Sequence, residues 1–155
     1  MAGAGKTSVG KALSLELGYE FLDTDKIIEI SHGKSKDIID SEGKDRFRVI
    51  EEEVLLSINF KNTLLATGGS AVFSPLAMEH LRDNSDVVYL EVSFENISER
   101  VLDFKERGFI KESHQSIEEA YLERLALYEK YADYSVTNNS SMKDCIHKIL
   151  SLLDL

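Results

Sequence analysis

The sequence predicts an α/β fold in which helices cover both faces of a parallel β-sheet. Helix-like and strand-like segments alternate along all 155 residues, which is typical of parallel strands joined by right-handed helical crossovers. The segment 87–92 is apolar without strict alternation, as expected of a strand buried on both faces. A glycine-rich opening leads directly into a periodic helix. We therefore expect one three-layer α/β/α domain over residues 1–155.

The first part of the chain is expected to hold four helices and two strands. Val9, Leu13 and Leu17 recur at four-residue spacing, and Gly18 can end the helix that they mark. The expected elements are a helix over 6–17, a strand over 19–22, helices over 26–31, 35–40 and 44–59, and a strand over 63–66.

The second part of the chain contains clear helix-start signals. Ser74 can cap a helix whose first position is Pro75, and Ser116 with Glu119 forms a capping box. Between the later helices, the polar segment 105–115 reads as a mobile loop. The expected elements are a helix from 75, a strand over 87–92, a helix over 93–104, a helix over 116–132, a strand over 134–137 and a helix over 141–153.

Composition excludes several classes of function. The net charge of −10 opposes binding to nucleic acid, because a nucleic acid is a polyanion. A membrane-spanning helix needs about 20 apolar residues, and we expect no membrane partner because no such run occurs. The single cysteine, Cys145, leaves no internal disulfide and no multi-cysteine metal site. We expect a cytoplasmic, monomeric protein in which Cys145 is a packing residue.

The strongest motif is AGAGKT at residues 2–7, which matches the end of the phosphate-binding pattern G-x-x-x-x-G-K-[ST]. Glycines let backbone N–H groups converge on phosphate oxygens, and the helix that follows directs its N-terminus at the same anion. Lys6 would contact the outer phosphates and Thr7 would bind Mg²⁺. An ordinary glycine-rich turn explains these residue types less well. The expected ATP-binding residues are Gly3, Ala4, Gly5, Lys6, Thr7 and Ser8.

One element that normally accompanies this motif is missing from the sequence. The first glycine of the pattern would lie one residue before Met1, and the buried strand that normally precedes such a loop is absent. We expect its neighbours to keep unpaired backbone groups beside an opened core.

Two carboxylates follow the predicted strand over 19–22. Asp23 and Asp25 would stand at the carboxyl end of a parallel strand, where ligands of open α/β sheets bind. Asp is also common at helix starts, so a purely structural cap is the alternative. The acidic run Glu51–Glu53 reads as a solvated helix face, with one member able to orient Arg48.

Two arginines are candidates for binding an anionic acceptor. Arg124 shares a helical stripe with Ile117, Tyr121 and Tyr128, so its charge needs an anionic partner there. Arg48 lies on the long helix over 44–59. A structural ion pair is the alternative, but the guanidinium fork also matches the two oxygens of a carboxylate ligand.

Taken together, these residues resemble the shikimate kinase family of P-loop kinases over nearly the whole chain. The resemblance rests on the order and spacing of several segments: AGAGKTSVGK, FLDTD, FRVIEEE, ATGGSAV, VVYLEV, ERGF and ERLALYEKYAD. It implies transfer of the γ-phosphate of ATP to a hydroxyl of shikimate. It also implies a sheet of order 2-3-1-4-5, in which the strand missing here is central.

The resemblance assigns roles on the nucleotide side. Lys6 and Thr7 would hold phosphate and Mg²⁺, and Asp23 would hold Mg²⁺ through water. Arg107, in a lid over 105–115, would reach the transferring phosphoryl group. Asn138 lies where the adenine-contacting loop begins.

On the acceptor side, the resemblance assigns Asp25 to the acceptor hydroxyls and to the proton that leaves the nucleophile. Arg48 and Arg124 would grip the carboxylate of shikimate. Gly68 and Gly69 would approach both the acceptor and the γ-phosphate.

The sequence departs from the family pattern at Ser70, where a third glycine is usual, at Gly108–Ile110 of the lid and at Ala126, where proline is common. Together with the absent strand, these differences keep two alternatives open. One is a related kinase for another small hydroxy acid or amino acid such as homoserine. The other is an inactive remnant that lost its first strand.

Overall fold

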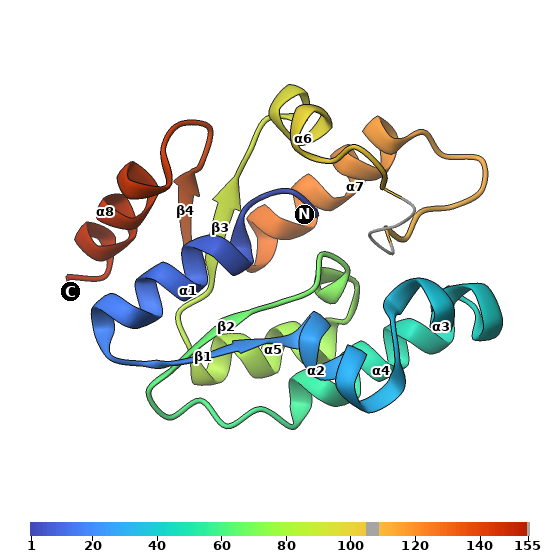
Figure 1. Ribbon diagram of the computed structural model, residues 1–155, viewed down its shortest axis with the longest axis horizontal. Helices are drawn as coiled ribbons and strands as arrows, with labels where there is room; N and C mark the ends of the chain where they lie inside the picture. Colours follow the sequence, from blue (N-terminus) through green and yellow to red (C-terminus); the bar gives the residue numbers. More distant parts are fainter. Residues whose placement is uncertain (105–108, 155) are drawn as a thin grey trace.

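The computed structural model describes residues 1–104 and 109–154, and helices and strands alternate along them as predicted (Figure 1). The elements are α1 (Lys6–Leu17), β1 (Glu20–Asp23), α2 (Thr24–His32), α3 (Ser35–Glu42), α4 (Lys44–Leu56), β2 (Thr63–Ala66), the short 3₁₀ helix η1 (Ala71–Phe73), α5 (Pro75–Asn84), β3 (Val88–Glu91), α6 (Phe94–Arg100), α7 (Ile117–Tyr131), β4 (Tyr134–Thr137) and α8 (Met142–Leu152).

Several helix boundaries differ from the sequence prediction, and those of α2, α4 and α6 have the clearest differences. Helix α2 begins at Thr24 rather than at residue 26, because the Asp23 side chain accepts hydrogen bonds from the N–H groups of Asp25 and Lys26. Helix α4 ends at Leu56 rather than at residue 59. Helix α6 ends at Arg100 rather than at residue 104, because the backbone of Val101 is extended. The capping box of Ser116 and Glu119 is present as predicted.

The strands form two separate parallel pairs. Strand β1 pairs with β2 from Glu20 opposite Thr63, and β3 pairs with β4 from Val88 opposite Tyr134. Within the described residues, β2 and β3 are not hydrogen-bonded to each other. The single sheet expected for this fold is therefore divided in two.

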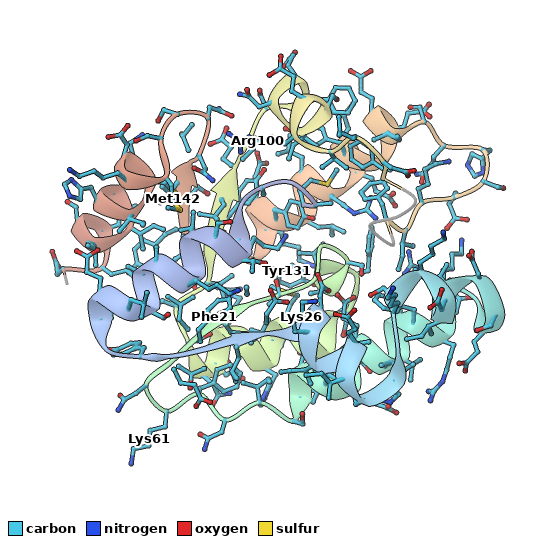
Figure 2. The ribbon with its side chains drawn as sticks, viewed as in Figure 1. Phe21, Lys26, Lys61, Arg100, Tyr131 and Met142 are labelled. Atoms are coloured by element: carbon cyan, nitrogen blue, oxygen red, sulfur yellow. The ribbon has the colours of Figure 1, made fainter. Side chains whose placement is uncertain are left out.

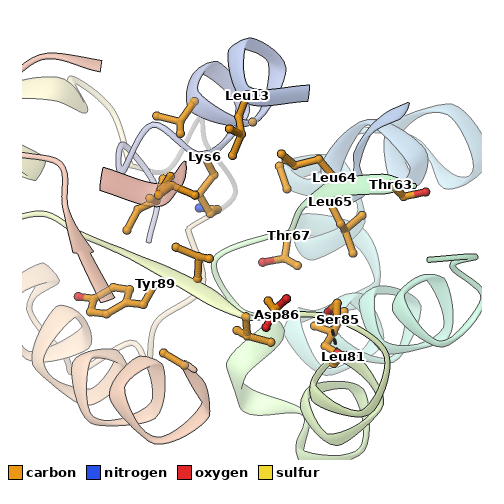
Figure 3. Close-up of a pocket in the computed structure, with 18 of the residues that line it drawn as sticks. Lys6, Leu13, Thr63, Leu64, Leu65, Thr67, Leu81, Ser85, Asp86 and Tyr89 are labelled. Carbon is orange, nitrogen blue, oxygen red and sulfur yellow. Dashed lines mark hydrogen bonds between the residues drawn. The ribbon is translucent and has the colours of Figure 1, made fainter. Parts of the chain in front are cut away.

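A cavity of about 540 Å³ lies between β2 and β3. In Figure 3, Leu13 of α1, Leu64 and Leu65 of β2 and Tyr89 of β3 border it. Strands β2 and β3 lie on either side of this cavity.

Helices cover both faces of the strands. Leu64 packs with the cluster that joins α1 to α8, and its neighbour Leu65 packs with the cluster under α5 and α7. Because successive side chains of a strand point to opposite faces, these clusters lie on opposite sides and form the outer layers. Cys145 is buried in the first cluster, as predicted. No helix among the described residues is long and apolar enough to cross a membrane.

Candidate active site

The shape of the opening loop requires glycine at two positions. Gly3 and Gly5 have left-handed φ angles of 74° and 88°. A Cβ on Gly3 would lie 2.6 Å from a methyl of Val101, and one on Gly5 would lie 2.8 Å from Nδ2 of Asn138. Gly5 precedes α1 without a side-chain cap, so the first N–H groups of α1 are available to an anion.

Lys6 stands at the start of α1 and points back over this loop. Its ammonium donates a hydrogen bond to the carbonyl of Met1, with Nζ and O 2.7 Å apart. Removal from water lowers the pKa of Lys6, while the nearby carboxylate of Asp25 opposes that shift. Lys6 therefore lies within electrostatic reach of the acceptor side of the site.

Thr7 and Asp23 meet at the end of β1. The Thr7 hydroxyl donates to Oδ2 of Asp23 at 2.7 Å, and Oδ1 of Asp23 accepts the N–H groups that begin α2. A hydroxyl and a carboxylate form the kind of oxygen pair that holds Mg²⁺ together with water and phosphate. The residues present therefore fit a magnesium ion beside the loop.

One cavity of about 310 Å³ joins the opening loop to the acceptor side. It brings together residues from both ends of the sequence and from the middle. They are Ala2, Gly3, Ala4, Gly5, Lys6, Thr7, Ser8, Asp25, Ser35, Phe47, Thr67, Gly69, Ser70, Arg100, Phe109, Ile110 and Arg124.

Asp25 lies in the first turn of α2, opposite the opening loop. Loss of hydration raises the pKa of its carboxyl, and Lys6 acts in the opposite direction. The structure thus brings together an acid, an ammonium and a phosphate-binding loop that the sequence predicted as partners.

Arg124 is only 2% exposed. Its guanidinium donates to the carbonyls of Ala120 and Ile110, and it stacks on Phe109 and Phe73, with its Cζ 4.3 and 5.1 Å from the two ring centroids. These contacts hold a positive charge at the cavity wall without a carboxylate partner among the described residues.

Arg48 contacts the same phenylalanine. Its Cζ is 4.8 Å from the centroid of Phe73, and its guanidinium is 3.8 Å from Asp45. In the described part of the chain, Arg48 lines a smaller cavity of about 140 Å³ and not the one that holds Asp25. The two arginines therefore meet at Phe73, but only Arg124 faces the larger cavity.

The glycine pair after β2 has two different environments. The Gly68 N–H donates to the hydroxyl of Thr24 at 2.9 Å, and a Cβ there would lie 2.0 Å from Oε1 of Glu51 and 2.9 Å from Oδ1 of Asp25. Gly69 lines the cavity, and its carbonyl accepts from the hydroxyl of Tyr128 at 2.7 Å.

Asn138 and Arg100 support the loop from the side of β4 and α6. The Asn138 side chain donates to the carbonyl of Ala4 at 2.8 Å, so in this structure it braces the phosphate loop. Arg100, labelled in Figure 2, donates to the carbonyl of Asn138 at 2.9 Å and lines the cavity. Arg100 was not among the residues predicted from the sequence, because the helix that holds it was expected to continue to residue 104, whereas α6 ends at Arg100.

The predicted lid is described only in part. Arg107 lies outside the described residues. Ile110 is buried beside Arg124, and Glu112 pairs with Lys44 of α4. The described part of this segment thus packs against the acceptor side of the site.

The prediction of a solvated acidic face was wrong for Glu51. Its side chain is 2% exposed, and its Oε2 accepts a 2.6 Å hydrogen bond from Ser70. Burial is the main reason that the pKa of Glu51 rises to about 7. The signal was available, because position 51 falls on the buried stripe of Phe47, Ile50 and Val54.

The fold and this cavity define an α/β protein of the P-loop kinase class. A family model described as "Shikimate kinase" matches residues 2–154. The chain is 37% identical over 150 residues to a shikimate kinase of Bacillus cytotoxicus, covering 96% of this chain and 91% of the relative. The chain therefore belongs to the shikimate kinase family.

Solved structures agree with this assignment. A shikimate kinase of Acinetobacter baumannii in complex with shikimate superposes with a TM-score of 0.87 at 35% identity, covering 97% of this chain and 87% of the other. A shikimate kinase of Aquifex aeolicus gives a TM-score of 0.87 at 29% identity, covering 99% and 92%.

Proposed function

We propose that this chain transfers the γ-phosphate of ATP to a ring hydroxyl of shikimate, forming shikimate 3-phosphate for aromatic amino-acid synthesis. The observation that carries the proposal is the shared cavity, in which the phosphate loop, Asp25 and Arg124 line one space. Such a space can hold a phosphate chain and a small carboxylic acid side by side. Family membership supports the same reaction.

The nucleotide is held by residues of the opening loop and α1. Backbone N–H groups of residues 3–8 and the N-terminus of α1 bind the phosphates. The ammonium of Lys6 leaves the Met1 carbonyl and neutralises charge on the outer phosphates. Thr7 and Asp23 would hold Mg²⁺, which offsets negative charge on the β- and γ-phosphate oxygens when bound.

The acceptor is oriented from the opposite wall. Asp25 accepts a hydrogen bond from the attacking hydroxyl and takes its proton as the new O–P bond forms; the bond from the γ-phosphorus to the β–γ bridging oxygen breaks, and ADP leaves with that electron pair. Arg124, together with Arg48, which stacks on the same Phe73 ring, binds the acceptor carboxylate. Gly68 has no side chain that would press on Asp25, so the acceptor ring can approach that carboxylate. Catalysis then rests on positioning and charge neutralisation.

The lid completes the site in this proposal. Arg107 would add positive charge to the transferring group, and closure of residues 105–115 would exclude water as a competing acceptor. Asn138 contributes by bracing the loop that binds the nucleotide. We further propose that the protein is cytoplasmic and monomeric. Sedimentation of the purified chain can test the oligomeric state, because a monomer has a mass of 17.5 kDa.

A coupled assay of ADP release with several acceptors tests the proposal. We expect turnover with shikimate and none with homoserine or other hydroxy acids. Turnover with another acid but not shikimate would favour a related kinase of different specificity. No ATP binding by the folded chain would favour an inactive remnant.

A further inference from the structure

Ser70 makes a contact that its backbone position does not require. Its φ and ψ angles of −97° and −6° are ordinary for any residue, so no special conformation selects serine here. Its buried hydroxyl donates to Oε2 of Glu51 at 2.6 Å. Ser70 also lines the cavity that holds Asp25 and Arg124. The hydroxyl therefore connects the acceptor site to a buried acid behind it.

Glu51 lies among positive groups without pairing with them. Arg48 precedes it by one helical turn on α4, where side chains three residues apart are neighbours. Arg124 on α7 is near enough to lower the pKa of Glu51. Within the described residues, no ion pair joins Glu51 to either arginine. The carboxyl is held by Ser70 instead.

Two buried atoms are left without a hydrogen-bond partner at this place. They are Oε1 of Glu51 and Nε of Arg48, and both residues line the cavity of about 140 Å³ beside Ser70. An acceptor oxygen and a donor N–H on neighbouring side chains can satisfy each other after a rotation of Glu51. The Ser70 hydroxyl opposes that rotation, because it holds the other carboxyl oxygen.

We propose that Ser70 is a positioning residue that keeps the carboxyl of Glu51 from pairing with the arginines that bind the acceptor carboxylate. The inference rests on the proposed function, since it assigns Arg48 and Arg124 to that carboxylate. A guanidinium already paired with Glu51 would bind an incoming carboxylate less well, because its charge would be neutralised. Ser70 thus acts on acceptor affinity through Glu51 and not by direct contact.

The charge state of Glu51 makes the proposal testable by pH. Burial raises its pKa to about 7, and Asp25 acts in the same direction, whereas the Ser70 hydrogen bond, Lys6 and Arg124 act in the opposite direction. Tyr128 of α7 also faces Glu51, and Arg48 lies on its own helix. Removing the Ser70 hydroxyl alone would raise the pKa of Glu51, but pairing of its carboxylate with an arginine must lower that pKa below the parent value, because an adjacent guanidinium favours the charged form more than a neutral hydroxyl does. Once ionised at higher pH, the carboxylate would have the arginines as its remaining partners.

The test is the full-length Ser70→Ala variant assayed with shikimate from about pH 5 to about pH 9. At the low end of this range Glu51 is mainly neutral in both proteins, so the KM values should agree best there. At high pH the KM for shikimate should rise about five-fold in the variant, with kcat and the KM for ATP changed less than about two-fold. The double variant S70A/E51Q should lose this pH dependence, because glutamine cannot ionise.

Ser74→Ala is the matched control. Ser74 also donates to a glutamate of α4, Glu52, but it does not line the cavity of Asp25 and Arg124. The KM of S74A for shikimate should depend on pH in the same way as that of the parent protein. A KM for shikimate that rises equally at every pH in S70A, or stays flat, would overturn the positioning role.

A second measurement separates this inference from the proposed function. Carbon-detected NMR titration of the Glu51 carboxyl should show a lower pKa in S70A, because its carboxylate then pairs with an arginine, and the Arg48 Nε–H should become protected from exchange at high pH. Both readouts hold even if the parent enzyme does not turn over shikimate, a result that would sink only the proposed function. An unchanged or higher pKa of Glu51 in S70A would overturn the inference itself.

Discussion

The nucleotide side and the acceptor side of the cavity are built in opposite ways. The phosphate-binding side comes from one continuous segment, residues 2–8, whose form depends on two glycines and the start of one helix. The acceptor side is assembled from α2, α4, the turn after β2 and α7. The nucleotide side depends on backbone conformation, so a short stretch of sequence is enough to predict it. The acceptor side forms only when helices that are distant in the sequence pack together.

Lys6→Met should have the largest effect on activity, because it removes the only charged side chain of residues 2–8, which form the nucleotide side. We expect kcat to fall about a thousand-fold in the coupled assay, while the melting temperature is kept. Lys11→Met is the control, since Lys11 is exposed on the same helix beside Phe21. A comparable loss in the control would mean that helix α1, and not the ammonium of Lys6, is what matters.

Arg124→Lys should chiefly affect binding on the acceptor side. Lysine keeps the charge but loses the planar fork, so we expect the KM for shikimate to rise about thirty-fold with a smaller change in kcat. Steady-state kinetics with each substrate varied will measure this. Arg46→Lys, an exposed change on α4, should leave both KM values alone. If the KM for ATP rose as much as that for shikimate, Arg124 would not belong to the acceptor side.

Gly68→Ala and Gly69→Ala compare neighbouring positions on the two sides. A Cβ at position 68 would press on Glu51 and Asp25, whereas one at 69 would lie 3.4 Å from Ala2 N and 3.6 Å from Met1. We expect kcat/KM for shikimate to fall about ten-fold in G68A and about two-fold in G69A. Equal losses in both variants would show that the turn responds as one unit.

Ser116→Ala should have the smallest effect, and it should change binding on neither the nucleotide side nor the acceptor side. It removes the capping box at the start of α7, in which Ser116 and Glu119 exchange hydrogen bonds of 2.7 and 3.1 Å. We expect a loss of about 1 kcal/mol in the free energy of unfolding, measured by urea denaturation, with unchanged kinetics. Ser41→Ala, an exposed serine within α3, should cost less. A change in the KM for shikimate would mean that the cap also sets the position of Arg124.

The same contrast explains what could be predicted from the sequence. Alternation of elements, the caps at Ser74 and Ser116 and the phosphate loop are local signals, and the structure confirms them. The burial of Glu51 and the contact of Arg48 with Phe73 depend on how α4 packs against the turn after β2. Helical periodicity could have indicated that Glu51 is buried, but no spacing along the chain predicts that Arg48 contacts Phe73.

The burial of the single cysteine offers a means to follow unfolding of this protein. Cys145 is 1% exposed and lies in the cluster that joins α1 to α8. A thiol must reach solvent before a reagent can modify it. Labelling of Cys145 should therefore be slow in the folded chain, and its rate should report how often α8 separates from α1.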